Sequence, residues 1–190
     1  MSSFWQSLLL GAAAEMGDKS QLVALAFAGR YPVRIVLWGI FVATALVHLF
    51  SVAFGELLGL TLPRFWINLA AGLAFIGFGL WTLRGDSLDD DETKAAHRFG
   101  PFLTVAISFF LAELGDKTML ATVTLASQYR AFIPVWLGST VGMVIADGLA
   151  IAVGIMAGKR LPERAIQLGA AAIFILSGVA TIIGAFQQAG

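Results

Sequence analysis

Long apolar stretches alternate with short polar connections along this chain. A helix that crosses a bilayer needs about 17 to 25 mostly apolar residues, and six stretches of that kind can be placed. They cover about residues 4–29, 34–60, 65–83, 101–128, 132–158 and 165–186. Pro, Gly or clustered charge occupies every connection, as is typical of the ends of helices. The pattern predicts an all-α integral membrane protein with six transmembrane helices.

The two halves of the chain repeat each other. A shift of 98 residues places identical residues on Phe4, Ala14, Glu15, Gly17, Asp18, Lys19, Leu22, Ala28 and Tyr31. A shift of 99 does the same for Gly39, Gly55, Gly59, Leu62, Pro63, Phe75 and Gly79. Because each unit holds an odd number of spans, the second unit enters the membrane in the opposite orientation. We expect two inverted three-helix repeats, residues 1–84 and 99–190, joined by a charged cytoplasmic loop at residues 85–98.

Basic residues predict which connections face the cytoplasm. Cytoplasmic loops carry an excess of Lys and Arg, and here the connections after the first, third and fifth spans hold most of them. These residues are Arg30, Arg34, Arg84, Lys94, Arg98, Lys159, Arg160 and Arg164, against Arg64 and Arg130 on the opposite side. Both termini are therefore expected on the non-cytoplasmic side. The first span lacks the basic start of a secretory signal, so we expect it to remain uncleaved.

Composition narrows the classes of function. With 58% hydrophobic and 13% charged residues, the chain has too little polar surface for a soluble globule. Its formal net charge is zero, so no charged field favours nucleic acid as a partner. Cysteine is absent, which excludes disulfides, thiolate metal sites and catalysis by a thiol. No phosphate-binding loop, nucleophile elbow or zinc-protease motif occurs, and we expect no enzyme activity.

Two charged strings interrupt the apolar pattern, EMGDKS at residues 15–20 and ELGDKT at residues 113–118. They fall near the middle of the first and fourth predicted spans. A charged residue at the centre of a membrane helix costs roughly 2.5 to 3.5 kcal/mol, so six in contact with lipid would cost about 15 to 21 kcal/mol. That sum exceeds the stability of an ordinary domain, about 5 to 15 kcal/mol. The charged side chains must therefore face each other, water or a bound ion.

The spacing of the acids favours a metal site. Glu15 and Asp18 are three residues apart and share a helical face, as do Glu113 and Asp116. In an inverted repeat the two helices meet near the pseudo-two-fold axis, which brings all four carboxylates together near the midplane. Four carboxylates without a thiol suit a hard cation such as Ca²⁺, Mn²⁺ or Mg²⁺ rather than Cu⁺ or Zn²⁺.

The glycine and hydroxyl residues of each motif allow two interpretations. Gly17 and Gly115 serve either close helix packing or a helix break that frees backbone groups for an ion. The length of the first span is compatible with tilt or with a break. Ser20 and Thr118 become metal ligands only if the helix opens. In an unbroken helix their hydroxyls bond back to the preceding turn.

The residues after the motifs differ between the halves. Gln21 offers a hard carbonyl oxygen to a metal ion, whereas Met119 at the equivalent position offers a soft thioether. A thioether ligand would shift the preference from Ca²⁺ toward Mn²⁺. Packing is the other role for Met119.

Each motif also contains a lysine. Lys19 and Lys117 lie four residues after a Glu and next to an Asp, so they either neutralise the acids in part or replace the ion when it leaves. Four carboxylates and two ammonium groups leave two negative charges, which one divalent cation or two protons would cancel. This balance suggests an exchanger.

Two more ionisable residues occupy equivalent positions in the second and fifth spans, His48 and Asp147. Either side chain could relay protons. Asp147 is the stronger candidate, because an unpaired acid inside a span is harder to explain structurally. His48 could instead be a neutral ring that hydrogen-bonds a neighbour. Glu56, near the external end of the second span, suits a solvated or cation-attracting rim as well as a pathway.

The duplicated E-x-G-D-K-[ST] motif, EMGDKS and ELGDKT, resembles the signature of the GDT-type cation/proton exchanger family. This family contains the Golgi manganese transporter of animals, the yeast Golgi calcium/proton exchanger and bacterial MneA-type manganese exporters. The resemblance covers essentially the whole chain. It implies an antiporter that moves Mn²⁺ or Ca²⁺ out of the cytosol as substrate, with no cofactor, and an ion site formed by the four motif acids. It also implies a multi-pass protein of the bacterial inner membrane. Because six spans can enclose a pathway, we expect either a monomer or a homodimer.

Two other functions stay open. One is an exporter of related fold for another cation or a cationic amino acid. The other is a non-transporting membrane scaffold in which buried ion pairs only specify helix packing. A scaffold should balance its buried charges, whereas here the motif acids outnumber the lysines four to two.

Overall fold

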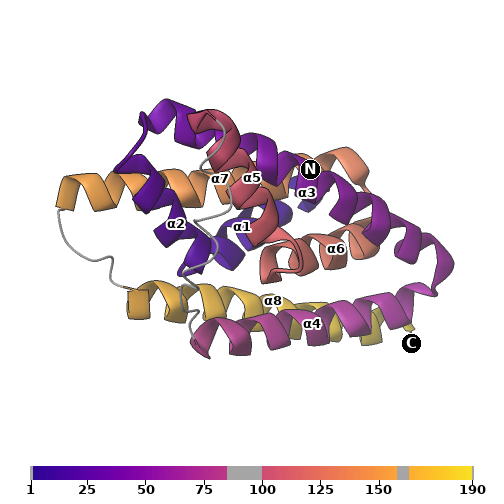
Figure 1. The fold of residues 1–190 in the computed structure, drawn as a ribbon. Helices are drawn as coiled ribbons and strands as arrows, with labels where there is room; N and C mark the ends of the chain where they lie inside the picture. The colour runs from indigo at the N-terminus through magenta and orange to yellow at the C-terminus, as the bar shows by residue number, and fades with distance from the viewer. Residues whose placement is uncertain (1, 85–99, 158–162, 190) are drawn as a thin grey trace.

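The computed structural model describes residues 2–84, 100–157 and 163–189. These residues form eight α-helices and contain no strand. The helices are α1 (Ser2–Glu15), α2 (Lys19–Ala28), α3 (Val33–Thr61), α4 (Arg64–Arg84), α5 (Pro101–Glu113), α6 (Lys117–Tyr129), α7 (Phe132–Ala157) and α8 (Glu163–Ala189). Figure 1 shows their arrangement. The predicted loop at residues 85–98 lies outside the described residues, as do Lys94, Arg98, Lys159 and Arg160.

Four of the helices, α3, α4, α7 and α8, are long and apolar enough to cross a membrane. Their ends agree with the predicted spans to within three residues. Proline helps to set the starts of some helices in this chain, because it fixes the backbone and lacks the N–H that a helix interior needs. Pro32 precedes α3, and Pro101 occupies the first turn of α5, where no such N–H is required.

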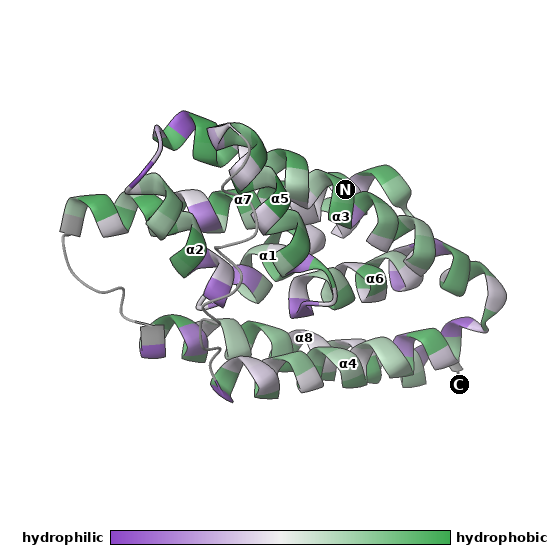
Figure 2. Cartoon of the chain, viewed as in Figure 1, coloured by the Kyte–Doolittle hydropathy of each residue, from purple (hydrophilic) through white to green (hydrophobic). Residues whose placement is uncertain are grey.

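The first and fourth predicted spans are each divided into two helices. α1 has 14 residues and α2 has 10, whereas α5 and α6 have 13 each. At 1.5 Å per residue each piece is about 15 to 21 Å long, too short for a hydrocarbon core of about 30 Å. The charged motifs occupy the two breaks. In Figure 2 hydrophilic residues mark both breaks among helices that are otherwise largely hydrophobic.

Each helix of the first half has a counterpart in the second half, offset by 98 or 99 residues at its start. Contacts between the halves follow the same correspondence. A Cβ atom on Gly39 would lie 2.7 Å from Val105, and one on its equivalent Gly138 would lie 2.9 Å from Ser7, the equivalent of Val105. The glycines therefore allow α3 to approach α5 and α7 to approach α1 in the same way.

The helices form two parts. α1 packs along α7, α5 packs along α3, and α3 and α7 contact each other. At that contact Thr44 Oγ1 donates to the sulfur of its equivalent, Met143, at 3.4 Å. α4 and α8 lie side by side beneath the other helices (Figure 1). Their backbones approach closely through small residues, since a Cβ atom on Gly178 would lie 2.6 Å from Gly72 O.

Two apolar clusters stabilise this arrangement, and one of them connects the two parts. One joins α1 and α6 to the α4–α8 pair and includes Leu10, Phe75 and Phe174. The other joins α2, α3 and α5 and includes Phe27 and Phe109. Both motif breaks lie between these clusters along the chain, so apolar packing on either side fixes the helix ends that carry the charges.

Candidate metal site

The two motifs break their helices by the same local geometry. Gly17 and Gly115 have φ angles of 76° and 83°, a conformation that costs other L-residues about 1 to 2 kcal/mol and that glycine adopts freely. The aspartates that follow have extended backbones and cap the next helix. Asp18 accepts from Ser20 N at 3.3 Å, and Asp116 accepts from Thr118 N at 3.4 Å. Each motif thus ends one helix at its Glu and begins the next after its Asp.

The hydroxyl after each lysine joins the two acids of its motif. Ser20 Oγ lies in hydrogen-bonding contact with a Glu15 oxygen and 2.7 Å from Asp18 Oδ2. Thr118 Oγ1 donates to Glu113 Oε2 at 2.5 Å and lies 3.3 Å from Asp116 Oδ2. The opened helix, rather than a bond to the preceding turn, determines where these hydroxyls point. Both are buried beside carboxylates, where a hydroxyl oxygen could also ligate a hard cation.

Gln21 and Met119 perform the same task despite their different chemistry. Gln21 Oε1 accepts from Gly17 N at 2.9 Å, and the sulfur of Met119 accepts from Gly115 N at 3.2 Å. Each side chain therefore satisfies the glycine N–H that the helix break leaves without a helical partner. The other end of the Gln21 amide donates to Ala146 O at 3.2 Å. The predicted metal ligand Gln21 is thus engaged with backbone groups at both ends.

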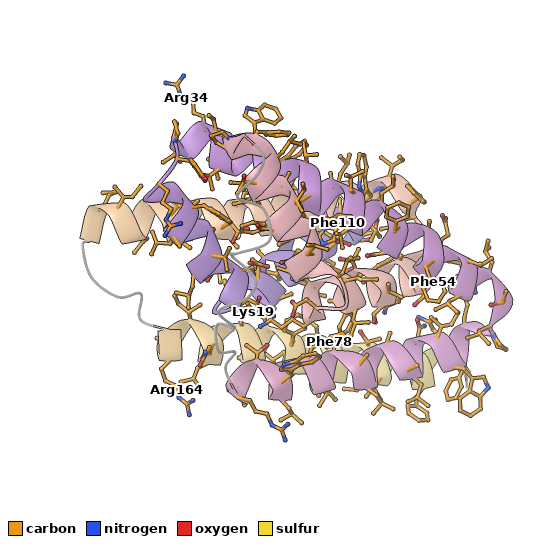
Figure 3. The ribbon with its side chains drawn as sticks, in the orientation of Figure 1. Lys19, Arg34, Phe54, Phe78, Phe110 and Arg164 are labelled. Carbon is orange, nitrogen blue, oxygen red and sulfur yellow. The ribbon has the colours of Figure 1, made fainter. Side chains whose placement is uncertain are left out.

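The motifs of the two halves meet in space. Lys117 Nζ lies 2.5 Å from Asp18 Oδ1, and both side chains are about 1% exposed. Glu113 is close enough to Glu15, Asp18 and Asp116 for their charges to interact. Lys19 lies at the start of α2, near the middle of the molecule (Figure 3). The four motif carboxylates therefore belong to one electrostatic cluster, in which the second motif supplies a lysine to an acid of the first.

Asp147 extends this cluster from α7. Its side chain is fully buried and close to Glu15, Asp18 and Glu113. Neither carboxylate oxygen of Asp147 has a hydrogen-bond donor among the described residues. Two carboxylates at this separation repel each other when both are ionised. A proton or a cation between Glu15 and Asp147 would remove that repulsion.

His48, the repeat equivalent of Asp147, has different surroundings. It is buried on α3, and its Nδ1 lies 3.3 Å from Thr140 Oγ1. Its Nε2 is buried without a hydrogen-bond partner among the described residues. This geometry matches a ring that hydrogen-bonds a neighbour, one of the two roles that the sequence left open.

Within residues 2–84, 100–157 and 163–189, no three acidic or histidine side chains converge closely enough to hold a metal ion as they stand. Oxygens at the centre are instead engaged by the Lys117 ammonium and by the Ser20 and Thr118 hydroxyls. The described side chains thus form a network of carboxylates, hydroxyls and one ammonium group.

The two breaks are covered to different extents. A Cβ atom on Gly17 would lie 2.8 Å from the Gln167 side chain of α8, whereas one on Gly115 would have no neighbour within 4 Å. Asp18 is buried and Asp116 is half-buried. The chemistry of the motifs is duplicated, but their packing against the α4–α8 pair is not.

Comparison with known protein families shows the family of this chain. The family model described as "Divalent cation/proton antiporter GDT1" matches residues 3–90 and 101–189. The chain belongs to the GDT1 family. It is therefore a member of a family of membrane antiporters rather than enzymes, for which divalent cations and protons are substrates and not cofactors.

Relatives of this GDT1 chain span its whole length. It is 34% identical over 184 residues to a Vibrio cholerae protein named "Putative manganese exporter", covering 95% of this chain and 90% of that protein. It is 29% identical to "GDT1-like protein sll0615" of Synechocystis, covering 94% and 96%. It is 26% identical to "GDT1-like protein 5" of Arabidopsis thaliana, covering 96% of each chain. No solved structure matches the chain.

The sequence did not reveal two features of the candidate site. The first is the ion pair between Lys117 and Asp18, because the expected partner of Lys117 was an acid of its own motif. The second is the shared role of Gln21 and Met119. Each of the two residues lies four positions after the glycine of its motif. If a helix break is assumed at that glycine, this spacing indicates the shared role.

Proposed function

We propose that this chain exports a divalent cation, Mn²⁺ in preference to Ca²⁺, from the cytosol in exchange for protons. The ion site consists of Glu15, Asp18, Glu113 and Asp116, with the hydroxyls of Ser20 and Thr118 beside them. Asp147 and the two lysines serve coupling or gating. The observation that carries this proposal is the contact of the two motifs through Lys117 and Asp18, 2.5 Å apart and buried.

Charge balance supports exchange rather than a structural role. The cluster contains five acids, counting Asp147, and two lysines. Buried ion pairs that only specify packing would balance, whereas this cluster keeps an excess of negative charge. A divalent cation or protons must compensate that excess inside a membrane, where uncompensated charge is costly. The scaffold alternative therefore accounts for less of the arrangement than transport does.

Lys117 supplies a simple exchange step. Its ammonium contacts a carboxylate oxygen of Asp18 that would bind the metal ion. An arriving cation takes that oxygen and releases the lysine, and Glu113 and Glu15 then close on the ion. When the cation leaves on the other side, protons and the lysine restore the balance. Asp147, buried close to Glu15, can share a proton with it during this return.

The proposed architecture is six spans in two inverted three-helix repeats, residues 1–84 and 99–190. Four long apolar helices support it, and the paired half-helices α1–α2 and α5–α6 would form the other two spans. Broken helices that meet at the midplane are a recurring solution in transporters with inverted repeats. The alternating access that we propose is a rocking of the two repeats around the motif cluster. Both termini would lie on the non-cytoplasmic side of a bacterial inner membrane, in a monomer or a homodimer.

Preference for Mn²⁺ over Ca²⁺ rests on the Vibrio cholerae relative, whose name is that of a manganese exporter. The carboxylates and hydroxyls of the site suit both ions. The Met119 sulfur, which would favour Mn²⁺ as a ligand, is engaged with Gly115 N. Another cation, or a cationic amino acid, is the alternative substrate.

Transport into everted membrane vesicles tests this function. Uptake of Mn²⁺, Ca²⁺ and Mg²⁺ is measured with and without a proton gradient, for the wild type and for Glu113→Gln. We expect Mn²⁺ uptake that depends on an acidic lumen and falls at least tenfold in Glu113→Gln. The matched control Glu56→Gln removes a half-buried carboxylate of α3 outside the motif cluster and should retain most of the flux. Undiminished flux in Glu113→Gln would contradict the site, and flux without a proton gradient would contradict the coupling.

A further inference from the structure

A cavity of about 300 Å³ lies between α1, α4, α6 and α8, away from the motif residues. Its lining includes six neutral polar side chains, Gln6, Asn68, Gln128, Ser177, Thr181 and Gln188. These residues come from the N-terminal part of α1, the start of α4, the end of α6 and the second half of α8. The cavity therefore lies along the second half of α8, the helix that ends near the C-terminus in Figure 1.

The lining favours water rather than lipid as the content of this cavity. Polar groups that face hydrocarbon without hydrogen bonds are costly. Gln128 Oε1 is buried and has no hydrogen-bond donor among the described residues. By contrast, a second hollow of about 300 Å³ is lined mainly by Leu37, Trp38, Phe41 and Val144, side chains that suit a lipid tail. Amide and hydroxyl oxygens in the first cavity can instead replace part of the water shell of a cation.

The cavity extends deep into the molecule. Ser177 and Gln188 both line it, and eleven residues of helix separate them, about 16 Å. This depth is about half of a hydrocarbon core of roughly 30 Å. Leu10 and Phe75 also line the cavity, and they are 4% and 1% exposed. Leu10 lies five residues before Glu15 on α1, or about 7.5 Å along the helix.

We propose that this cavity is the external vestibule through which the divalent cation leaves, closed in this conformation by Leu10 and Phe75. The inference rests on the proposed function and adds the exit route to it. Neutral oxygens hold a divalent cation more weakly than carboxylates do, which suits a site that must release its ion. The two apolar side chains separate the vestibule from the acids and must move before the ion passes.

Single cysteines test the vestibule directly, because the chain has no cysteine of its own. Thr181→Cys and Ser177→Cys place a thiol in the cavity from α8. Leu176→Cys is the matched control, since Leu176 is next to Ser177, does not line the cavity and is 70% exposed. A charged, membrane-impermeant methanethiosulfonate is applied from the outside of intact cells. Modification is read by the mass of the purified protein, and transport by Mn²⁺ efflux.

We expect both cavity cysteines to be modified from outside and Mn²⁺ efflux to fall at least fivefold after modification. The Leu176→Cys thiol should stay unmodified, because a thiol in lipid does not ionise to the reactive thiolate. Two results would overturn the vestibule: cavity cysteines that resist the external reagent, and modification that leaves efflux unchanged. Efflux before treatment reports separately on the proposed function, since its absence in the untreated cysteine variants and in the wild type would contradict transport itself.

Discussion

At the scale of single residues, the two break glycines carry a conformational demand that differs from that of the helical glycines. Gly115 has φ 83° and open space around it, whereas Gly17 has φ 76° and the Gln167 side chain beside it. Gly115→Ala should cost about 1 to 2 kcal/mol of stability from backbone strain, and Gly17→Ala should cost more. Thermal unfolding in detergent measures both. Gly77→Ala, in the helical interior of α4 with nothing within 4 Å, is the control and should not destabilise. Equal melting temperatures for Gly115→Ala and Gly77→Ala would contradict the break.

Lys117 gives a second prediction at this scale. If its ammonium competes with the metal ion for Asp18, then Lys117→Gln should bind Mn²⁺ at least about tenfold more tightly, a gain of about 1.4 kcal/mol or more. The same variant should transport slowly, because nothing replaces the ion on release. Lys117→Arg, which keeps the charge, should stay close to the wild-type affinity. Equilibrium binding and vesicle uptake measure the two effects. Weaker Mn²⁺ binding by Lys117→Gln would show that the lysine supports the site instead.

The sequence predicts which residues form the candidate site but does not predict how they pair. The cost of charges in a membrane pointed to both motifs, and their spacing pointed to a shared cation site. In a continuous helix Lys117 would pair with Glu113, four residues before it. The turn at Gly115 changes the direction of the chain, and Lys117 contacts Asp18 of the other motif. A contact between residues 99 positions apart depends on how the halves dock, which helical spacing does not encode.

At the scale of elements, the break is reinforced by the hydroxyl that begins α6. Thr118 Oγ1 donates to Glu113 at 2.5 Å and accompanies the cap by Asp116. Thr118→Val removes this donor from a buried carboxylate and should cost about 1 to 3 kcal/mol, with Mn²⁺ binding weakened about tenfold. Thr118→Ser should restore binding, since Ser20 has this role in the first half. If Thr118→Val binds Mn²⁺ as tightly as the wild type does, the hydroxyl of Thr118 has no role in the ion site.

Hydropathy predicted the four continuous long helices well, because α3, α4, α7 and α8 each contain a long apolar window with few charged residues. It placed the motifs in the first and fourth spans but left a tilted helix and a broken one equally possible. Gly17 is compatible with both until its backbone conformation is known. The break exposes the N–H group of its glycine, and Gln21 or Met119, four residues later, accepts a hydrogen bond from it. Hydropathy scales do not describe this hydrogen bond.

At the scale of the whole molecule, the repeat in the sequence reappears as matched helices and matched glycine contacts between the halves. The packing around the breaks is not matched, since Gln167 covers Gly17 and nothing lies within 4 Å of a Cβ on Gly115. A repeated sequence can thus predict equivalent elements but not which half is covered in a given conformation. The alternating access that we propose requires this difference in packing between the halves, because the two repeats would exchange their surroundings during the transport cycle.

The number of metal ions bound per chain tests the central claim, that each motif supplies half of one site. Purified protein is titrated with Mn²⁺, and free Mn²⁺ is followed by electron paramagnetic resonance. If the two motifs form one site, we expect one tightly bound Mn²⁺ per chain in the wild type. At the same Mn²⁺ concentration, neither Glu15→Gln nor Glu113→Gln should bind any. Two Mn²⁺ ions per chain, with one remaining in each variant, would mean two independent sites and would contradict the account.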